Sequence, residues 1–282
     1  MESKEFQKLL KKNGAYETAS GRAYFVGDRL FGWSDTWYYL RTFLIVLGAW
    51  VTAWCIGFDR KAWASRACDI LRLIEGCDGR ISICGLESLA KLEGPAVYVA
   101  NHMSMVETML LPGAIILAFQ DVTVVVKESL LRYPFFGKIM RCLNPISVTR
   151  RNPMQDFKEV LNKGEKCLHG GQSVLVFPQA TRSAKFNPGD FNTLGIKLAR
   201  RACVPIVPVA LKTDFQGVGR VFRDLGRIDR NKTIYFKFGE PLTVEGNGGE
   251  AHEKVVRFIT DNLHEWGACV KDQPTDAERQ IR

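Results

Sequence analysis

The chain has 282 residues, of which 46% are hydrophobic, and a formal net charge of +9. This length suffices for one sizeable domain with its own core plus an appended segment, and the composition is that of a folded chain rather than a disordered one. The positive charge favours anionic partners, but it does not choose among phosphates, nucleic acid, acidic proteins and anionic lipid.

The first 36 residues are mostly polar and carry no pattern of a cleavable signal peptide. The next part is different, because residues 42–58 contain no charge and are bordered by several tryptophans and tyrosines. Seventeen residues are close to the length of a membrane span, and the aromatic border is typical of a membrane interface. We therefore expect a membrane-associated helical segment over residues 37–74 rather than a buried core helix. Whether it spans the bilayer or lies half-embedded stays open.

Beyond residue 78, short β-branched segments alternate with helical patterns. Strands are expected at 80–86, 96–100, 122–126, 146–149, 173–177, 204–211 and 233–239, and helices at 153–169, 191–202 and 249–267. Such alternation predicts an α/β fold with a mixed, largely parallel sheet flanked by helices. This domain is expected to cover residues 75–267, followed by a disordered tail over residues 268–282.

The eight cysteines form no CxxC pair and no zinc-finger spacing, so we expect no metal site. Several lie in apolar runs, where a free thiol behaves as a small hydrophobic side chain. We expect reduced cysteines in a domain that faces the cytoplasm.

The stretch ANHMSMVETMLL contains the strongest chemical signal. His102 directly follows a buried strand, at the strand end where open α/β sheets place their sites, and Glu107 comes five residues later. An imidazole can act as a general base near neutral pH, and a carboxylate on its other nitrogen would orient it. Ser104 and Glu107 also fit a capping box that starts the next helix. The spacing alone does not separate the two roles.

A second stretch, LVFPQATRS at residues 175–183, also closes a strand and ends in a loop with Arg182. Together, NH-x-S-x-x-E and FP-x-x-TRS resemble the glycerolipid acyltransferases, the family of 1-acyl-glycerol-3-phosphate acyltransferase. Two further blocks, residues 127–150 and 204–211, resemble the remaining family blocks in the same order. The similarity covers residues 75–240, most of the domain.

The resemblance implies acyl transfer in phospholipid synthesis, from an acyl thioester, acyl-coenzyme A or acyl carrier protein, to the hydroxyl of a lysophospholipid, with 1-acyl-sn-glycerol-3-phosphate as the favoured acceptor, and without a cofactor. His102 resembles the family's catalytic base, with Glu107 as its partner, and an apolar segment that seats the enzyme on membrane lipid is usual in the family. The residues implied to bind substrate, chiefly the acceptor's phosphate, are Arg182, Arg150, Thr181, Gln179 and Lys127.

Two positions depart from the commoner family form, which has Asp where Glu107 stands and Glu-Gly where Gln179 and Ala180 stand. Gln179 removes a negative charge beside the implied phosphate site, so the identity of the acceptor is open. Basic residues in 185–201 are expected either to bind the donor or to form a solvated helix face.

Other classes lack their signatures: the sequence holds no G-x-S-x-G elbow, no phosphate-binding glycine loop and no nucleic-acid motif. The remaining alternative is a catalytically inactive, lipid-binding membrane protein with an acyltransferase fold. The sequence does not determine the oligomeric state.

Overall fold

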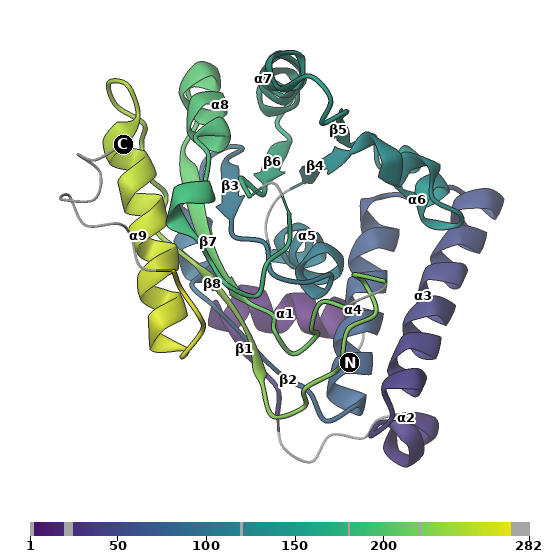
Figure 1. The fold of residues 1–282 in the computed structure, drawn as a ribbon. Coiled ribbons are helices and arrows are strands. Elements are labelled where there is room, and N and C mark those ends of the chain that lie inside the picture. Colours follow the sequence, from purple (N-terminus) through teal and green to yellow (C-terminus); the bar gives the residue numbers. More distant parts are fainter. Residues whose placement is uncertain (1–2, 20–24, 119–120, 180, 220–221, 272–282) are drawn as a thin grey trace.

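The structure of the chain is a computed structural model. It describes residues 3–19, 25–118, 121–179, 181–219 and 222–271. Across these residues the strands form one eight-stranded sheet in the order β1-β2-β8-β7-β3-β6-β4-β5 (Figure 1). The strands are β1 Tyr16–Glu17, β2 Arg80–Cys84, β3 Val97–Ala100, β4 Val122–Lys127, β5 Ile146–Val148, β6 Ser173–Val176, β7 Ile206–Lys212 and β8 Thr233–Phe238.

Strands β7, β3, β6, β4 and β5 run parallel to their neighbours, whereas β8 pairs antiparallel with β7. The predicted α/β class with a mixed, largely parallel sheet is confirmed, and all seven predicted strands are present. The two-residue strand β1 was not predicted, because two residues carry no alternating pattern.

Helices cover both faces of the sheet (Figure 1). Their bounds are α1 Ser3–Asn13, α2 Val26–Phe31, α3 Asp35–Cys55, α4 Arg60–Gly76, α5 Val106–Ala118, α6 Phe136–Cys142, α7 Pro153–His169, α8 Leu194–Ala202 and α9 Gly249–Glu265, with short 3-10 turns at Leu86–Lys91, Glu128–Arg132 and Pro188–Asp190.

Strand β3 shows how the sheet separates two cores. All four of its residues are buried, and they alternate between the faces. Val97 and Val99 join the cluster under α7, α8 and α9, whereas Tyr98 and Ala100 join the cluster under α1, α4 and α5. Burial on both faces explains the unbroken apolar run of this strand.

Helix boundaries follow local capping where the chain supplies a cap. Helix α7 begins as predicted at Pro153, because the Asn152 side chain accepts a hydrogen bond from the N–H of Gln155 at 3.1 Å. Helix α8 begins at Leu194, three residues later than expected, since residues 188–190 form a separate 3-10 turn.

The segment expected at 37–74 is two helices that differ in character. Helix α3 buries one narrow face, formed by Tyr38, Thr42, Ala49 and Ala53, and its other residues are half-buried or exposed. Helix α4 is capped by Asp59 and lies in the core, packing closely against α5. A Cβ on Gly113 of α5 would lie only 2.2 Å from the Ala67 side chain of α4. The domain boundary drawn at residue 75 therefore does not correspond to a break in packing.

The tail expected to be disordered from residue 268 begins with an ordered stretch. The N–H of Phe186 donates to the carbonyl of Cys269 at 3.0 Å, and the N–H of Lys271 donates to the carbonyl of Phe186 at 2.8 Å. The expectation is wrong for residues 268–271, because this backbone finds hydrogen-bond partners in the loop after β6. Residues 272–282 lie outside the described residues.

All eight cysteines are free, but only some are core residues. Burial raises the pKa of the Cys68 and Cys77 thiols to about 12, whereas Cys55, Cys142 and Cys203 are exposed.

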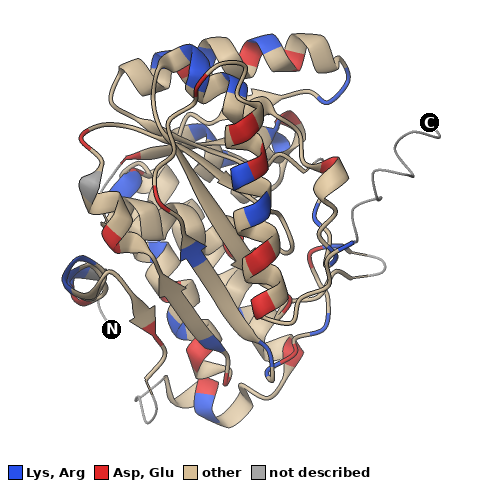
Figure 2. Ribbon diagram, turned by 90° about the vertical axis from the view of Figure 1, so that its left-hand side faces the viewer, with Lys and Arg blue, Asp and Glu red and all other residues tan. Residues whose placement is uncertain are grey.

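Charge is mixed on the face that Figure 2 shows, with basic and acidic residues interspersed along the helix in front. That face therefore does not gather the net charge of +9 into one basic surface.

Candidate active site

The predicted residues lie at the carboxyl ends of adjacent parallel strands. His102 follows β3, Lys127 ends β4, Arg150 follows β5, and Gln179 and its neighbours follow β6. Since these strands are neighbours in the order β3-β6-β4-β5, their carboxyl ends meet at one edge of the sheet. The predicted site is therefore brought to one edge, although its members differ in how firmly they are held.

His102 is held by its backbone. Just before it, the buried Asn101 side chain donates to the Leu211 carbonyl at 2.7 Å and accepts from the Leu211 N–H at 2.8 Å, which fastens the end of β3 to β7. The N–H of His102 donates to Gln179 Oε1 at 2.7 Å, and its carbonyl accepts from the N–H of Ser183 at 3.0 Å. Both strand-end turns thus fix the position of the imidazole.

The imidazole stacks on the Phe177 ring with 4.5 Å between centroids, and its side chain is 14% exposed. Its Nδ1 lies 3.0 Å from Glu107 Oε1. One ring nitrogen is therefore committed to the carboxylate.

Glu107 is fully buried and accepts hydrogen bonds from every side. Besides His102, Oε1 accepts from the N–H groups of Met103 at 2.7 Å and Ser104 at 2.8 Å. Oε2 accepts from the hydroxyls of Ser104 at 3.0 Å and Thr213 at 2.5 Å. The two roles that spacing alone did not separate coexist, because the carboxylate contacts the imidazole and also satisfies the amides at the start of α5.

Burial by itself raises the pKa of Glu107, since the charged form loses its hydration. The hydrogen bonds from His102 and Thr213 and the attraction of the imidazole outweigh that effect, so the pKa of this carboxyl is lowered overall. An ionised carboxylate can only accept, so Nδ1 of His102 carries the proton and donates. When the ring is neutral, the other nitrogen, Nε2, therefore holds the lone pair that can accept a proton.

Thr213 and Asn101 were not among the predicted site residues. Thr213 follows β7 directly, so a hydroxyl at the end of a predicted strand was the available signal. The sequence does not reveal that β7 lies beside β3, and this adjacency is what brings Thr213 to Glu107.

Arg182 lies in the turn after β6 and is already paired. Its Nη2 is 2.5 Å from Asp224 Oδ1, and its backbone carbonyl accepts from Arg223 Nη2 at 3.0 Å. Its side chain is 24% exposed, and Asp224 belongs to the segment between β7 and β8.

Arg150, Lys127 and Thr181 are exposed at the rim. Arg150 has a φ of +59°, a left-handed conformation that is held because its N–H donates to Asp156 Oδ2 at 2.6 Å. Among the described contacts, neither the Arg150 nor the Lys127 side chain is hydrogen-bonded to His102 or Arg182. Arg150 and Lys127 thus lie at the same edge of the sheet as His102 and Arg182, but their side chains form no described hydrogen bond with them.

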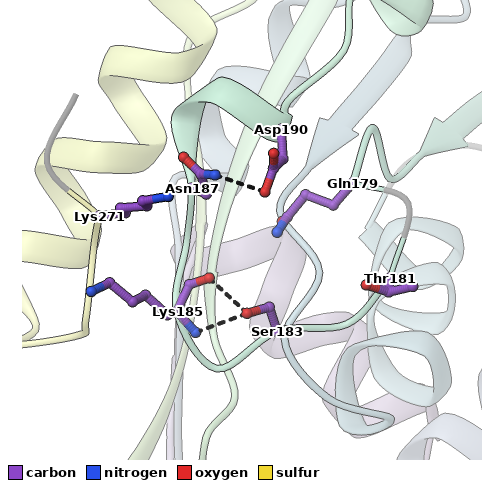
Figure 3. A pocket seen from close by; sticks show the side chains of 7 residues that line it. All are labelled: Gln179, Thr181, Ser183, Lys185, Asn187, Asp190 and Lys271. Carbon is purple, nitrogen blue, oxygen red and sulfur yellow. Dashed lines mark hydrogen bonds between the residues drawn. The ribbon is translucent and has the colours of Figure 1, made fainter. Parts of the chain in front are cut away.

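A pocket of about 470 Å³ adjoins the histidine turn (Figure 3). It is lined by polar side chains from the turn after β6, the following loop and the ordered start of the tail: Gln179, Thr181, Ser183, Lys185, Asn187, Asp190 and Lys271. Gln179 belongs both to this lining and to the support of His102. The other departure from the commoner family form, Ala180, lies outside the described residues. Within the described part of the chain, no group of three or more His, Cys, Asp and Glu side chains has a metal-binding arrangement.

The α/β fold carries a buried histidine–carboxylate pair at the edge where its parallel strands end, and comparison with known proteins identifies the family. A family model described as Acyltransferase matches residues 80–212. The 1-acyl-sn-glycerol-3-phosphate acyltransferase of Pseudomonas aeruginosa is 30% identical over 212 residues, covering 74% of this chain and 77% of that protein.

The Escherichia coli enzyme of the same name is 31% identical over 134 residues, which cover 46% of this chain and 52% of that protein. Among solved structures, the 1-acyl-sn-glycerophosphate (LPA) acyltransferase PlsC from Thermotoga maritima is similar with a TM-score of 0.63 and 19% identity. That match covers 86% of this chain and 98% of the other and supports the fold. The chain belongs to the acyltransferase family, and the prediction of an O-acyltransferase is confirmed.

Proposed function

We propose that the protein transfers a fatty acyl group from an acyl thioester to the free hydroxyl of 1-acyl-sn-glycerol-3-phosphate, as a step of phospholipid synthesis. The observation that carries the proposal is the His102–Glu107 pair, 3.0 Å apart at a sheet edge that also gathers cationic side chains. The names of the similar enzymes from Pseudomonas aeruginosa and Escherichia coli support the same acceptor.

In the proposed reaction, His102 Nε2 takes the proton of the acceptor hydroxyl while the oxygen attacks the thioester carbonyl. The C–S bond breaks as the ester C–O bond forms, and the imidazolium returns its proton to the leaving thiolate. Glu107 stabilises the transient imidazolium and keeps its orientation. A thioester is already activated, so this mechanism requires no metal ion or cofactor.

The acceptor's phosphate is assigned to the cations of the edge. Arg182 is the central candidate, because a guanidinium binds pairs of phosphate oxygens and the Arg182 turn is fastened to His102 through Ser183. Arg150, Lys127 and Thr181 form the outer part of this site. Gln179 supports the His102 backbone and gives the pocket beside it a neutral wall.

We assign the donor to acyl-coenzyme A or acyl carrier protein. Lys185 and Lys271 of the pocket supply positive charge for either donor's anionic groups.

Membrane association is assigned to α3. Among the described helices, α3 alone is long and apolar enough to cross a membrane, and only 22% of its apolar window is buried. Its narrow buried face packs on α4 and α6, so we place the helix half-embedded, with Leu40, Phe43 and Leu44 toward lipid. The free cysteines support a domain that faces the cytoplasm.

The test is acyl transfer by the purified, detergent-solubilised protein. Labelled acyl-coenzyme A and acyl carrier protein are offered separately, each with a panel of lysophospholipids, to wild type, His102→Ala and His264→Ala. His264 is an exposed histidine of α9 and serves as the matched control. We expect transfer to 1-acyl-sn-glycerol-3-phosphate that falls roughly 10²- to 10⁴-fold in His102→Ala and persists in His264→Ala.

Equal rates in wild type and His102→Ala would remove the imidazole from the mechanism. Absence of transfer by wild type to every acceptor, with lipid binding intact, would favour the inactive lipid-binding protein.

A further inference from the structure

The segment that follows Thr213 and leads to β8, described over residues 214–219 and 222–232 and here called the β7–β8 loop, has no role in the mechanism above. We propose that this loop is a second lipid-contacting surface, that it seats on an anionic bilayer, and that it positions Arg182 through Asp224. The lipid contact stands independently of catalysis, whereas the link to Arg182 rests on the proposed function.

The loop exposes large apolar side chains. Phe222 is 68% exposed and Leu225 is 53% exposed, although most large apolar residues of the sheet are buried. Arg223 and Arg227, in the same stretch, are also exposed. Aromatic and aliphatic side chains interleaved with cations are the composition that inserts into the headgroup region of anionic membranes.

The loop is fastened to the helix proposed to lie in the membrane. The Tyr39 hydroxyl of α3 donates to the Gly226 carbonyl, and the N–H of Ile228 donates to Asp35 Oδ2 at 3.1 Å. Arg230 also donates to Asp35 Oδ1, at 2.8 Å. Figure 1 shows the loop, in green, extending from the ends of β7 and β8 toward α4 and the start of α3. The loop is therefore held against the first turns of α3, the helix that also exposes Leu40, Phe43 and Leu44.

The same loop holds the proposed phosphate-binding arginine. Asp224 stands between Phe222 and Leu225 in the sequence, and its Oδ1 lies 2.5 Å from Arg182 Nη2. Arg223 adds a hydrogen bond to the Arg182 carbonyl. One guanidinium edge is thereby taken by Asp224, which leaves the remaining N–H groups for a phosphate. Asp224 is thus a positioning residue, and seating the loop in lipid fixes where Arg182 meets an acceptor that itself lies in the bilayer.

The lipid surface is tested by partitioning of the full chain between buffer and sedimentable vesicles. Vesicles of phosphatidylcholine alone and with phosphatidylglycerol are compared for wild type, Phe222→Ser/Leu225→Ser and Arg223→Ser/Arg227→Ser. We expect the first pair to weaken partitioning at least tenfold on both vesicles, because two large apolar side chains no longer leave water. The second pair should weaken it only on anionic vesicles, roughly fivefold per arginine.

Matched controls come from helices α7 and α9. Met154→Ser removes an apolar side chain of 67% exposure from α7, and Arg257→Ser removes an exposed arginine from α9. Both should partition as wild type does. Unchanged partitioning of Phe222→Ser/Leu225→Ser overturns the lipid surface and leaves these side chains free for a protein partner.

The link to Arg182 is tested with Asp224→Asn and Asp224→Glu, using the acceptor presented in vesicles. We expect Asp224→Asn to raise the acceptor KM about tenfold with little change in kcat or in vesicle partitioning, and Asp224→Glu to restore part of the loss. An unchanged KM overturns the positioning role. If wild type transfers no acyl group, the proposed function fails, while the partitioning experiment still decides the lipid surface.

Discussion

The inner and outer parts of the sheet edge are built differently. In the inner part, Glu107 is fully buried and receives five hydrogen bonds, and His102 is fixed through its ring and its backbone. In the outer part, Arg150 and Lys127 are exposed at strand ends. Proton transfer requires fixed geometry within tenths of an ångström, whereas a phosphate can be met by flexible cations. The difference teaches that the proposed base is held rigidly, whereas the proposed headgroup site is built from side chains that can adapt.

Among substitutions that test this difference between the two parts, Glu107→Gln is expected to have the largest effect on rate and stability. The substitution replaces one carboxylate oxygen, which accepts hydrogen bonds, with an NH₂ group, which donates them. Because five donors surround this carboxylate, a buried hydrogen bond is lost and the new NH₂ group faces another donor. We expect a rate loss of roughly 10²- to 10⁴-fold and a loss of about 2–4 kcal/mol of unfolding free energy. Steady-state kinetics and urea unfolding measure both.

Loss of stability with a wild-type rate would reduce Glu107 to a helix-start residue. Loss of rate with unchanged stability would mean that the buried network contributes little to the fold.

A smaller effect is expected from Thr213→Val, which keeps the shape but removes the hydroxyl that donates to Glu107. We expect a rate loss of about tenfold and a stability loss of about 1–2 kcal/mol. The control is Thr260→Val in α9, whose buried Oγ1 has no hydrogen-bond partner within the described residues. Equal effects of the two substitutions on rate would remove Thr213 from the inner site.

Substitutions in the outer part should change the binding of the acceptor rather than the unfolding free energy of the protein. Arg150→Gly removes the guanidinium at a left-handed position that glycine adopts without strain, so unfolding free energy should stay within about 1 kcal/mol of wild type. The acceptor KM should rise several-fold with kcat nearly unchanged. The neighbouring exposed Arg151, which is not left-handed, provides the control Arg151→Gly, and a similar rise in KM there would show that position 150 is not specific.

The smallest effect concerns acid stability. The pKa of Glu107 is lower in the folded chain than its ordinary value, so its ionised form stabilises the fold above that ordinary value. The contribution disappears as pH falls through the lowered pKa. The difference in unfolding free energy between wild type and Glu107→Gln should therefore be constant near neutrality and shrink below about pH 4. A difference that does not depend on pH would show that Glu107 is not ionised in the fold.

Much of the fold could be predicted because its signals are local. Continuous apolar runs such as that of β3, and the Asn152–Pro153 start of α7, depend only on neighbouring residues, and the structure agrees with them. Helix α4 was assigned to the membrane segment instead, because its buried residues have a helical period that does not reveal what covers them. Strand β1 and the ordered residues 268–271 gain their structure from distant partners, which no local pattern shows.

The sequence by itself determined the residue types at the site, since His102 and Arg182 both stand at the ends of recognisable strands. Tertiary structure decided the partners: the order of β7, β3 and β6 brings Thr213, Glu107 and Gln179 around one histidine, and the β7–β8 loop brings Asp224 to Arg182. The physical reason is that hydrogen bonds and ion pairs act over a few ångströms, and distances of that size between residues more than 30 positions apart exist only once the sheet has formed.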